Sequence, residues 1–158
     1  MKIKFLSLLC LICLIIACCF NNILNFSNSI LIKFKFGREK IDINYVIDGD
    51  TLKLKDGKRL RLVGIDCYEI SDYPRAFRQI DGKNVKDIHD VIKLGYEAKG
   101  YLKRIIDENN GNIYLKKIPN PDKYGRILGT LYTQKGQNIN KMMLNDGLCI
   151  PYVFKDKK

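Results

Sequence analysis

Two short runs of alternating apolar and polar residues, separated by a tight-turn signal, constrain the fold more than any other part of the chain. They lie within residues 47–69, and their apolar positions are Leu52, Leu54, Leu60 and Leu62. Alternation with a period of two is typical of a strand with one apolar face. Asp56 and Gly57 between the runs are a strong signal for a hairpin turn. The segment therefore predicts an antiparallel β-hairpin.

Carboxylates gather at the ends of this predicted hairpin. Asp50 precedes the first run, after a turn in which Gly49 is free to adopt a left-handed conformation. Asp66 and Glu69 lie at and just beyond the end of the second run. Because antiparallel strands bring these ends together, we expect the three carboxylates to meet, as a site for a hard cation requires.

Arg61 lies in the second run, five residues before Asp66. In a regular strand this odd spacing places the two side chains on opposite faces. We therefore expect a bend or bulge near Gly64 if both residues serve one site. A fixed guanidinium beside a cation site suits the cleavage of a phosphodiester, because both groups stabilise negative charge on phosphate oxygens.

The chain is strongly basic. Its 158 residues contain 28 Lys and Arg against 17 Asp and Glu, a formal charge of +11, which becomes +9 (26 against 17) without Lys2 and Lys4. A small domain of this charge favours a polyanionic partner, either nucleic acid or an anionic membrane surface. The alternative is a basic surface with no specific partner. The length allows one domain with one core.

The N-terminus has the pattern of an export signal. Two lysines precede an almost unbroken apolar run over residues 5–20, which is short for a membrane span of roughly 20 residues. Residues 1–20 are therefore predicted to be a signal peptide, or a lipoprotein signal in which Cys18 receives a lipid. An uncleaved signal anchor is the alternative, since residues 30–36 add further apolar side chains.

The predicted organisation continues with a tether over residues 21–40 and a folded domain over residues 41–158. The domain is expected to be exported: secreted, periplasmic or membrane-anchored outside the cytoplasm. Only two cysteines, Cys67 and Cys149, lie in it. An exported pair can form a disulfide, but two isolated small residues are more often simply packed, so we expect buried thiols.

The rest of the domain predicts a mainly β structure. Periodicity predicts strands at residues 41–47, 112–118, 126–133 and 150–154, and helices at residues 96–109 and 139–144. Residues 70–95 have no sustained period and predict a long surface loop. With the hairpin, this order lacks a βαβ rhythm. It favours an α+β, mainly β fold: a five-stranded Greek-key barrel of the oligonucleotide-binding (OB-fold) type with two or three helices.

Three ordered motifs carry a resemblance to a known family. They are Ile47-Asp48-Gly49-Asp50-Thr51, then Arg61-Leu62-Val63-Gly64-Ile65-Asp66 with Glu69, and finally Asp122-Lys123-Tyr124-Gly125-Arg126. Together they resemble the staphylococcal nuclease (thermonuclease) family, over residues 41–154. The resemblance implies the five-stranded barrel and a Ca²⁺-dependent endonuclease that cleaves DNA and RNA.

The same resemblance implies a role for each site residue. Asp50, Asp66 and the backbone carbonyl of Cys67 would bind Ca²⁺, and Glu69 would orient or deprotonate the attacking water. Arg61 and Arg126 would hold the phosphate, while the nucleotide would contact Asp122, Lys123, Tyr124 and Tyr152. The chain departs from the family pattern at Tyr68, where a proline usually precedes the glutamate. It also departs in the spacing before Tyr152, which is one residue shorter.

Two other classes of function stay open from the sequence. A non-catalytic OB-type domain that binds nucleic acid needs only the fold and the charge. A surface lipoprotein with a basic adhesion face needs only the N-terminal signal and the charge. We expect a monomer that acts on DNA and RNA, with membrane anchoring through the N-terminal segment or a lipidated Cys18 as a further expectation.

Overall fold

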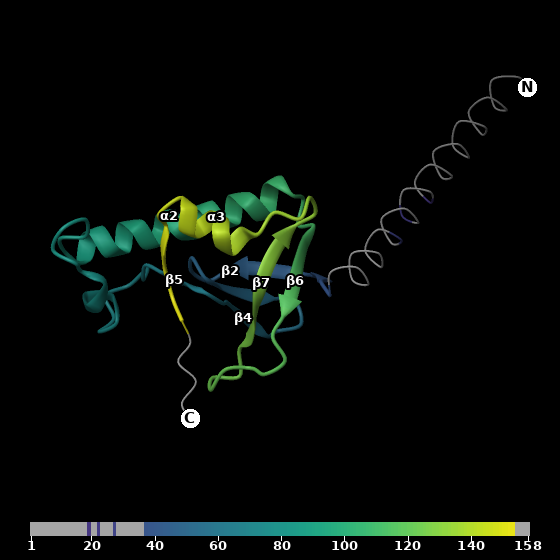
Figure 1. Cartoon of the computed structure of the whole chain (residues 1–158), viewed down its shortest axis with the longest axis horizontal. Helices are drawn as coiled ribbons and strands as arrows, with labels where there is room; N and C mark the ends of the chain where they lie inside the picture. Colours follow the sequence, from purple (N-terminus) through teal and green to yellow (C-terminus); the bar gives the residue numbers. More distant parts are fainter. Residues whose placement is uncertain (1–18, 20–21, 23–26, 28–36, 154–158) are drawn as a thin grey trace, which may run out of the picture. The chain divides into compact units, whose positions relative to one another are not determined.

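The computed structural model describes residues 19, 22, 27 and 37–153 (Figure 1). The strands of this part are β1 (Glu39–Ile41), β2 (Ile43–Val46), β3 (Thr51–Leu54), β4 (Arg59–Leu62), β5 (Ile65–Cys67), β6 (Ile113–Lys117), β7 (Ile127–Thr133) and β8 (Cys149–Pro151). Its helices are the 3₁₀ turn η1 (Ala76–Gln79), α2 (Ile88–Glu108) and α3 (Ile139–Asn145). The expected α+β, mainly β class with a small number of helices is confirmed.

Six strands form one mixed sheet in the order β1-β6-β7-β4-β3-β2, and β5 and β8 form a separate antiparallel pair. Within the large sheet β4 pairs with β7 in parallel, whereas the β2–β3, β3–β4 and β6–β7 pairs are antiparallel. The strand predicted over residues 41–47 is divided at Asp42 into β1 and β2, which lie at opposite ends of this order. Helices α2 and α3 pack against each other on one side of the strands (Figure 1).

The hairpin β3–β4 has the register expected from its alternating sequence. Leu52 lies opposite Leu60, and both side chains are fully buried. The backbone N–H of Lys58 donates to the carboxylate of Asp56 at 2.9 Å, which stabilises the predicted turn. The local pattern was therefore sufficient to predict this hairpin.

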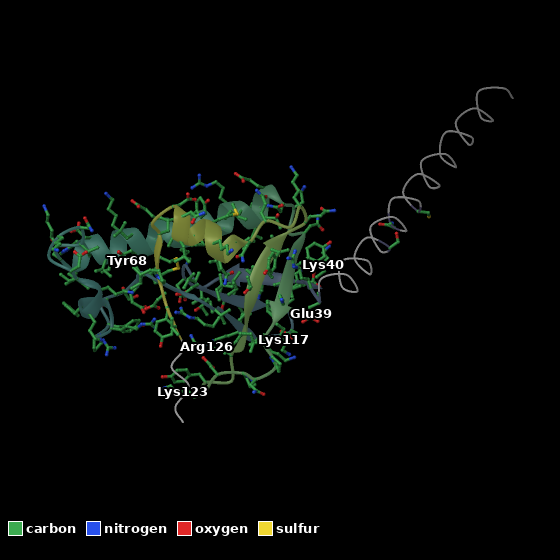
Figure 2. All side chains as sticks on the ribbon, in the orientation of Figure 1. Glu39, Lys40, Tyr68, Lys117, Lys123 and Arg126 are labelled. Atoms are coloured by element: carbon green, nitrogen blue, oxygen red, sulfur yellow. A yellow bond between two sulfur atoms is a disulfide. The ribbon has the colours of Figure 1, made fainter. Side chains whose placement is uncertain are left out.

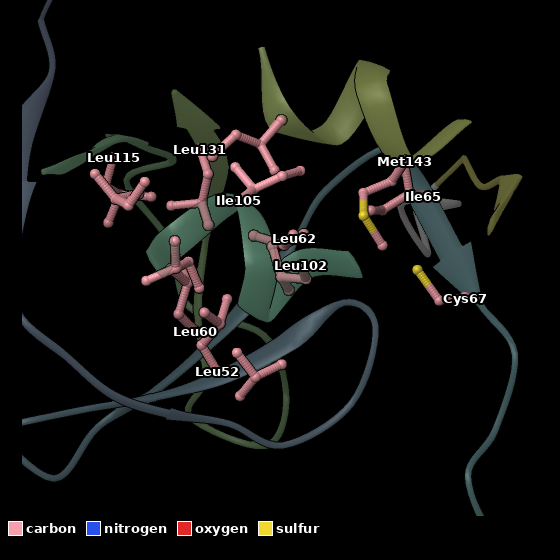
Figure 3. Packing of buried hydrophobic residues seen from close by; sticks show 14 of the residues in the cluster. Leu52, Leu60, Leu62, Ile65, Cys67, Leu102, Ile105, Leu115, Leu131 and Met143 are labelled. Carbon is pink, nitrogen blue, oxygen red and sulfur yellow. The ribbon is translucent and has the colours of Figure 1, made fainter. Parts of the chain in front are cut away.

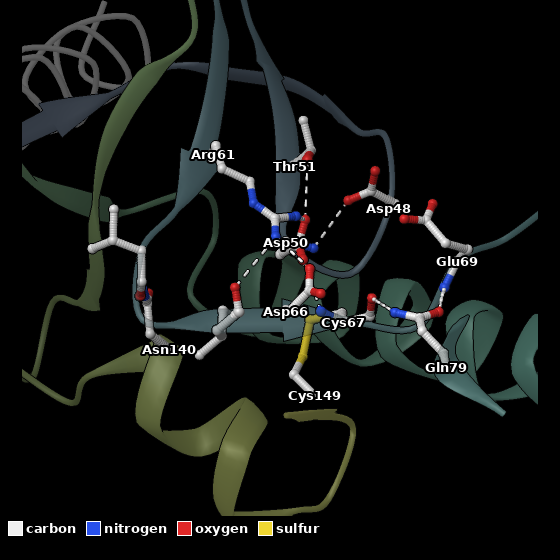
Figure 4. Close-up of a disulfide and its surroundings, with 12 residues drawn as sticks. Asp48, Asp50, Thr51, Arg61, Asp66, Cys67, Glu69, Gln79, Asn140 and Cys149 are labelled. Carbon is white, nitrogen blue, oxygen red and sulfur yellow. Dashed lines mark hydrogen bonds and ion pairs between the residues drawn. A yellow bond between two sulfur atoms is a disulfide. The ribbon is translucent and has the colours of Figure 1, made fainter. Parts of the chain in front are cut away.

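A sharp bend at Gly64 separates β4 from β5. Gly64 has a φ of +78°, a conformation that residues with a Cβ rarely adopt. After the bend β5 leaves the large sheet and pairs with β8. This confirms the predicted bend, and its consequence is that Arg61 and Asp66 face each other (Figure 4).

Helix α2 begins at Ile88, eight residues before the predicted start, so the long loop expected over residues 70–95 is shorter than predicted. The side chain of Asp87 caps the helix by accepting the backbone N–H groups of His89 and Asp90 at 2.8 and 3.0 Å. Val91 in the first turn is fully buried. The cap and the buried valine therefore extend the apolar face of the helix toward its N-terminus.

The main core lies between the large sheet and α2 (Figure 3). Leu102 and Ile105 of α2 pack in one cluster with leucines of the sheet, namely Leu52, Leu60, Leu62, Leu115 and Leu131. Full burial of one such side chain is worth about 1.5–3 kcal/mol. This packing holds β4, which carries Arg61, firmly in the core.

Cys67 and Cys149 form a disulfide, so the expectation of two packed thiols is wrong. The two residues lie opposite each other in the β5–β8 pair. Residues that lie directly opposite each other in an antiparallel pair have neighbouring side chains, and the Cα atoms of Cys67 and Cys149 are 3.9 Å apart. The register of two strands that are 82 residues apart therefore determines the bond.

The predicted signal over residues 1–20, apart from Cys19, and most of the predicted tether over residues 21–40 lie outside the described residues. Cys18, the predicted lipidation site, is also outside them. Among the residues that are described, no helix combines the length and the apolar character needed to cross a membrane.

Candidate active site

The guanidinium of Arg61 joins two of the predicted carboxylates (Figure 4). Its Nη1 forms an ion pair with Asp50, and its Nη2 lies 2.7 Å from Oδ1 of Asp66. The same Nη2 donates to the backbone carbonyl of Ile65 at 3.3 Å. Only 6% of the Arg61 side chain is exposed, and this burial lowers the pKa of its guanidinium, although the contact with Asp66 opposes the shift. The pairing of opposite charges offsets the cost of burying all three groups.

The turn before β3 is tied to β5 by backbone and packing contacts. Oδ2 of Asp50 accepts the backbone N–H of Cys67 at 2.8 Å. Gly49 lies between, and a Cβ at this position would come within 2.7 Å of the Cβ atoms of Cys67 and Ala98. Gly49 is not among the glycines with positive φ in the described chain, so it does not use the left-handed conformation that is open to a glycine. The turn needs a glycine here because no side chain fits.

Glu69 lies just beyond β5 and faces an arginine that sequence reasoning did not select. Nε of Arg75 lies 3.1 Å from Oε1 of Glu69, and Nη2 of Arg75 also pairs with Asp66. Burial raises the pKa of Glu69, and the charge of Arg75 opposes this shift. A base with a raised pKa holds a transferred proton more readily at neutral pH. Arg75 thus joins Asp66 and Glu69 into one charged cluster with Arg61.

Arg126 and the loop before β7 form the second half of the candidate site. Oδ1 of Asp122 accepts the backbone N–H groups of Tyr124 and Arg126, both at 2.9 Å. Oδ2 of Asp122 lies 2.7 Å from Nε of Arg126. Asp122 therefore shapes the loop and orients the guanidinium of Arg126, a role that the sequence prediction, which assigned Asp122 to nucleotide contact, did not include.

Tyr124 and Lys123 lie on the outer side of this loop. Tyr124 is 69% exposed, and two cations lie close to its ring. Nζ of Lys123 is 4.9 Å from the ring centroid, and Cζ of Arg126 is 5.4 Å from it. Lys123 and Arg126 project from the same end of the domain in Figure 2. The loop thus presents two positive charges and one aromatic face together.

The two halves line one pocket of about 1050 Å³. Its lining includes Arg61 and Asp66 from the first half, and Asp122, Lys123, Tyr124 and Arg126 from the second. Tyr152, after β8, also lines it, so the structure brings this predicted residue to the site. Three of the predicted site residues, although described, do not line the pocket: Asp50, Cys67 and Glu69. Asp50 is paired with Arg61 and Glu69 is paired with Arg75, and both arginines line the pocket.

The oxygen atoms around Arg61 match the ligands of Ca²⁺ in chemical type. Asp50 and Asp66 offer carboxylates and Cys67 offers a backbone carbonyl, whereas nitrogen and thiolate ligands are characteristic of transition metals. Within the described residues there is no group of three or more His, Cys, Asp or Glu side chains arranged to hold a metal. The guanidinium of Arg61 lies between the carboxylates of Asp50 and Asp66 and forms an ion pair with each. The donor types fit a hard cation, and in this structure both carboxylates are paired with Arg61 instead.

Four further residues shape the site without having been predicted. Besides Arg75 they are Asp48, Gln79 and Gly95. Asp48 accepts the backbone N–H of Asp50 at 3.1 Å, and burial raises the pKa of Asp48 although a hydrogen bond from Thr51 opposes the shift. The Asp-Gly-Asp motif contained Asp48, so its turn role was available as a signal.

Gly95 of α2 lies directly against the backbone that carries Glu69. A Cβ at Gly95 would come within 2.3 Å of the carbonyl oxygen of Glu69 and 2.8 Å of that of Tyr68. A glycine in the middle of an amphipathic helix is a recognisable signal of close packing, since alanine has the higher helix propensity. The sequence does not indicate which segment it contacts.

Comparisons with known proteins agree with this geometry. A family model described as "Staphylococcal nuclease homologue" matches residues 59–158, and the chain is 28% identical over 114 residues to Endonuclease YhcR of Bacillus subtilis (strain 168). It is also 30% identical over 111 residues to an uncharacterized endonuclease of Escherichia coli. These matches cover 70% and 68% of this chain, but only 9% and 57% of the two relatives. The chain belongs to the staphylococcal nuclease homologue family.

Proposed function

We propose that the protein is a Ca²⁺-dependent endonuclease that hydrolyses phosphodiester bonds of DNA and RNA with little sequence preference. The observation that carries this proposal is the convergence of Arg61 and Arg126, from distant parts of the chain, on one pocket beside the carboxylate of Asp66. Two guanidinium groups that line one space suit the binding of a phosphate, because phosphate oxygens can take the place of the carboxylates that these groups now bind.

Asp50, Asp66 and the carbonyl of Cys67 would hold the ion. When bound, Ca²⁺ would polarise a phosphoryl oxygen and offset the negative charge there. Glu69 would orient a water molecule and accept its proton as the water oxygen attacks phosphorus. The bond from phosphorus to the leaving sugar oxygen would break, and that oxygen would take up a proton from solvent. Arg61 and Arg126 would stabilise the additional charge on the phosphate oxygens, and loss of one such donor costs about 3–4 kcal/mol, or roughly 10²–10³ in rate.

The lining of the pocket supports weak sequence preference. Its lining includes five cations, against two carboxylates, and two exposed aromatic rings, Tyr124 and Tyr152. Cations bind the backbone that all nucleic acids share, and an aromatic ring can stack on any base. Because the cations and the rings can bind DNA and RNA alike, both polymers are proposed substrates.

We also propose that the chain is exported and acts as a monomer outside the cytoplasm. The motivation is the signal-like pattern over residues 1–20, with anchoring through this segment or a lipidated Cys18 as its variant. Mass spectrometry of the protein from the exporting cells would give the mature N-terminus. An intact Met1 without lipid on a cytoplasmic protein would contradict export.

The central test is cleavage by the full-length protein. Single-stranded DNA, duplex DNA and RNA are incubated with the protein and Ca²⁺, Mg²⁺ or a chelator, and products are resolved by length. We expect Ca²⁺-dependent internal cleavage of all three substrates. Ca²⁺ should also raise the melting temperature in the absence of substrate, because an ion that binds only the folded state stabilises it.

Matched variants separate the enzyme from a non-catalytic domain that binds nucleic acid, the alternative favoured by the charge of +11. Glu69→Gln and Arg126→Lys should each lose roughly 10²-fold or more in rate. Arg59→Ala, at an exposed position of the strand that carries Arg61, should retain the rate. Tight binding of nucleic acid by the unmutated protein with no cleavage in any condition would refute the proposal.

A further inference from the structure

The side chain of Gln79 bridges the backbone on both sides of Tyr68 (Figure 4). Its Nε2 donates to the carbonyl oxygen of Cys67 at 3.0 Å, and its Oε1 accepts the backbone N–H of Glu69 at 2.9 Å. One amide group is thus bound to a proposed cation ligand and to the backbone of the proposed base.

The chemistry of the two partners determines the orientation of this amide. A carbonyl oxygen can only accept a hydrogen bond, and a backbone N–H can only donate one. An amide side chain offers a donor and an acceptor at this spacing, whereas an ionised carboxylate has no donor and an ammonium has no acceptor. Gln79 therefore fits its two partners in a way that Glu or Lys at the same position does not.

Gln79 is itself held in a preformed piece of structure. It ends the 3₁₀ turn η1, whose Ala76 is fully buried in a small cluster with Val85 and Val91. On the other side of the same backbone, Gly95 of α2 leaves no room for a Cβ against Glu69. The segment from Cys67 to Glu69 is therefore confined between the Gln79 amide and helix α2.

We propose that Gln79 is a positioning residue that holds the Cys67 carbonyl and the Glu69 backbone in fixed relation during phosphodiester cleavage. This inference rests on the proposed function, since it assigns Gln79 to the same site. A displacement of about 1 Å in a reacting group can cost roughly 10²-fold in rate. Gln79 also lines the pocket, but in this role it acts through its hydrogen bonds to Glu69 and Cys67.

The test compares the full-length protein with Gln79→Met and Gln79→Glu. Methionine has a similar length and removes both hydrogen bonds. Glutamate keeps the acceptor for the Glu69 N–H but removes the donor to the Cys67 carbonyl. Gln134→Met, at an exposed position of a distant turn, is the matched control. Steady-state kinetics and NMR hydrogen exchange of the Glu69 amide are measured for each protein.

Gln79→Met should lower kcat by roughly 10- to 100-fold and leave KM within about 2-fold, because substrate binding by Arg126 and Tyr124 is retained. It should also accelerate exchange of the Glu69 amide by about 10-fold or more, since a protecting hydrogen bond is lost. Gln79→Glu should keep the amide protected and still lower kcat. Gln79→Glu also tests the positioning role if Gln79→Met does not fold.

Different results overturn the two proposals. If the Glu69 amide exchanges equally fast in the unmutated protein and in Gln79→Met, Gln79 does not restrain the Glu69 backbone. A kcat for both Gln79 variants equal to that of Gln134→Met would refute the positioning role. Absence of cleavage in the unmutated protein would refute the proposed function. The exchange measurement would still decide whether Gln79 restrains the Glu69 backbone.

Discussion

Loss of the Cys67–Cys149 disulfide should destabilise the protein strongly. The bond joins residues separated by 82 positions, and it therefore closes a loop of most of the described chain. The loop-entropy relation gives about 4.5 kcal/mol of stabilisation at about 25 °C for a loop of this length, mainly by restricting the unfolded chain. A domain of this size has a total stability of about 5–15 kcal/mol, so the bond supplies a large fraction of it.

Urea unfolding followed by circular dichroism, with and without a phosphine reductant, measures this contribution. With an m value of about 1.5 kcal/mol/M, the midpoint should fall by roughly 3 M urea on reduction. The double variant Cys67→Ser/Cys149→Ser should unfold at the midpoint of the reduced protein and show no response to reductant. Because this variant keeps the four cysteines near the N-terminus, it shows whether they contribute to the effect of the reductant.

Two results would refute this reasoning. Alkylation of Cys67 and Cys149 in the unfolded protein without reductant would show that the bond does not form. A midpoint shift below about 0.5 M urea, with the bond proven by mass spectrometry, would show that the unfolded chain is already compact and gains little freedom on reduction.

Three further predictions concern single positions. Asn140→Ala should lower the free energy of unfolding in urea by about 2–4 kcal/mol. The buried Asn140 amide accepts the backbone N–H of Leu131 and donates to the carbonyl of Val63, and both groups would lose their partner. A cost near zero would contradict this. Gly95→Ala should destabilise by about 1–3 kcal/mol despite the better helix propensity of alanine, because its Cβ collides with the Glu69 carbonyl; a gain in melting temperature would be inconsistent with the packing. Burial opposes ionisation of Asp122, but hydrogen bonds from the backbone and side chain of Arg126 outweigh it and hold the pKa of Asp122 below its ordinary value. The stability from this shift is fully present above the ordinary pKa of about 3.9 and disappears as the pH falls through the lowered pKa, so Asp122→Asn should be less stable at neutral pH and approach the unmutated protein in acid; a stability difference that does not depend on pH would exclude this linkage.

The features that the sequence predicted are those with local causes. The β3–β4 hairpin follows from alternation around Asp56-Gly57, and it has the expected register. The bend at Gly64 was predictable because Arg61 and Asp66 have an odd spacing, and only a break in the strand can bring their side chains to one face. The motifs also located both halves of the pocket, since each half is a short segment with its own internal contacts.

The features that the sequence did not predict depend on contacts between distant segments. The disulfide requires the β5–β8 register, which no pattern near Cys67 reveals. Arg75 and Gln79 lie in a segment without period, where their side chains are indistinguishable from other polar loop residues until η1 is placed beside β5. The early start of α2 is different, because Asp87 is a capping residue that the sequence displays, and only the unclear periodicity after it concealed the helix.

Glycines show most clearly where sequence reasoning reaches its limit. Gly64 and Gly49 both follow a strand or turn signal, and a left-handed conformation is a reasonable expectation for each. Gly64 has that conformation and open space around its Cα, whereas Gly49 lacks it and is closed in by Cys67 and Ala98. The two positions therefore tolerate different substitutions. Asparagine can occupy a left-handed position with open space, but no larger side chain fits a position closed by buried side chains. Because Gly49 separates Asp48 from Asp50 and touches the disulfide, this second kind of constraint couples the geometry of the carboxylates to the β5–β8 pair.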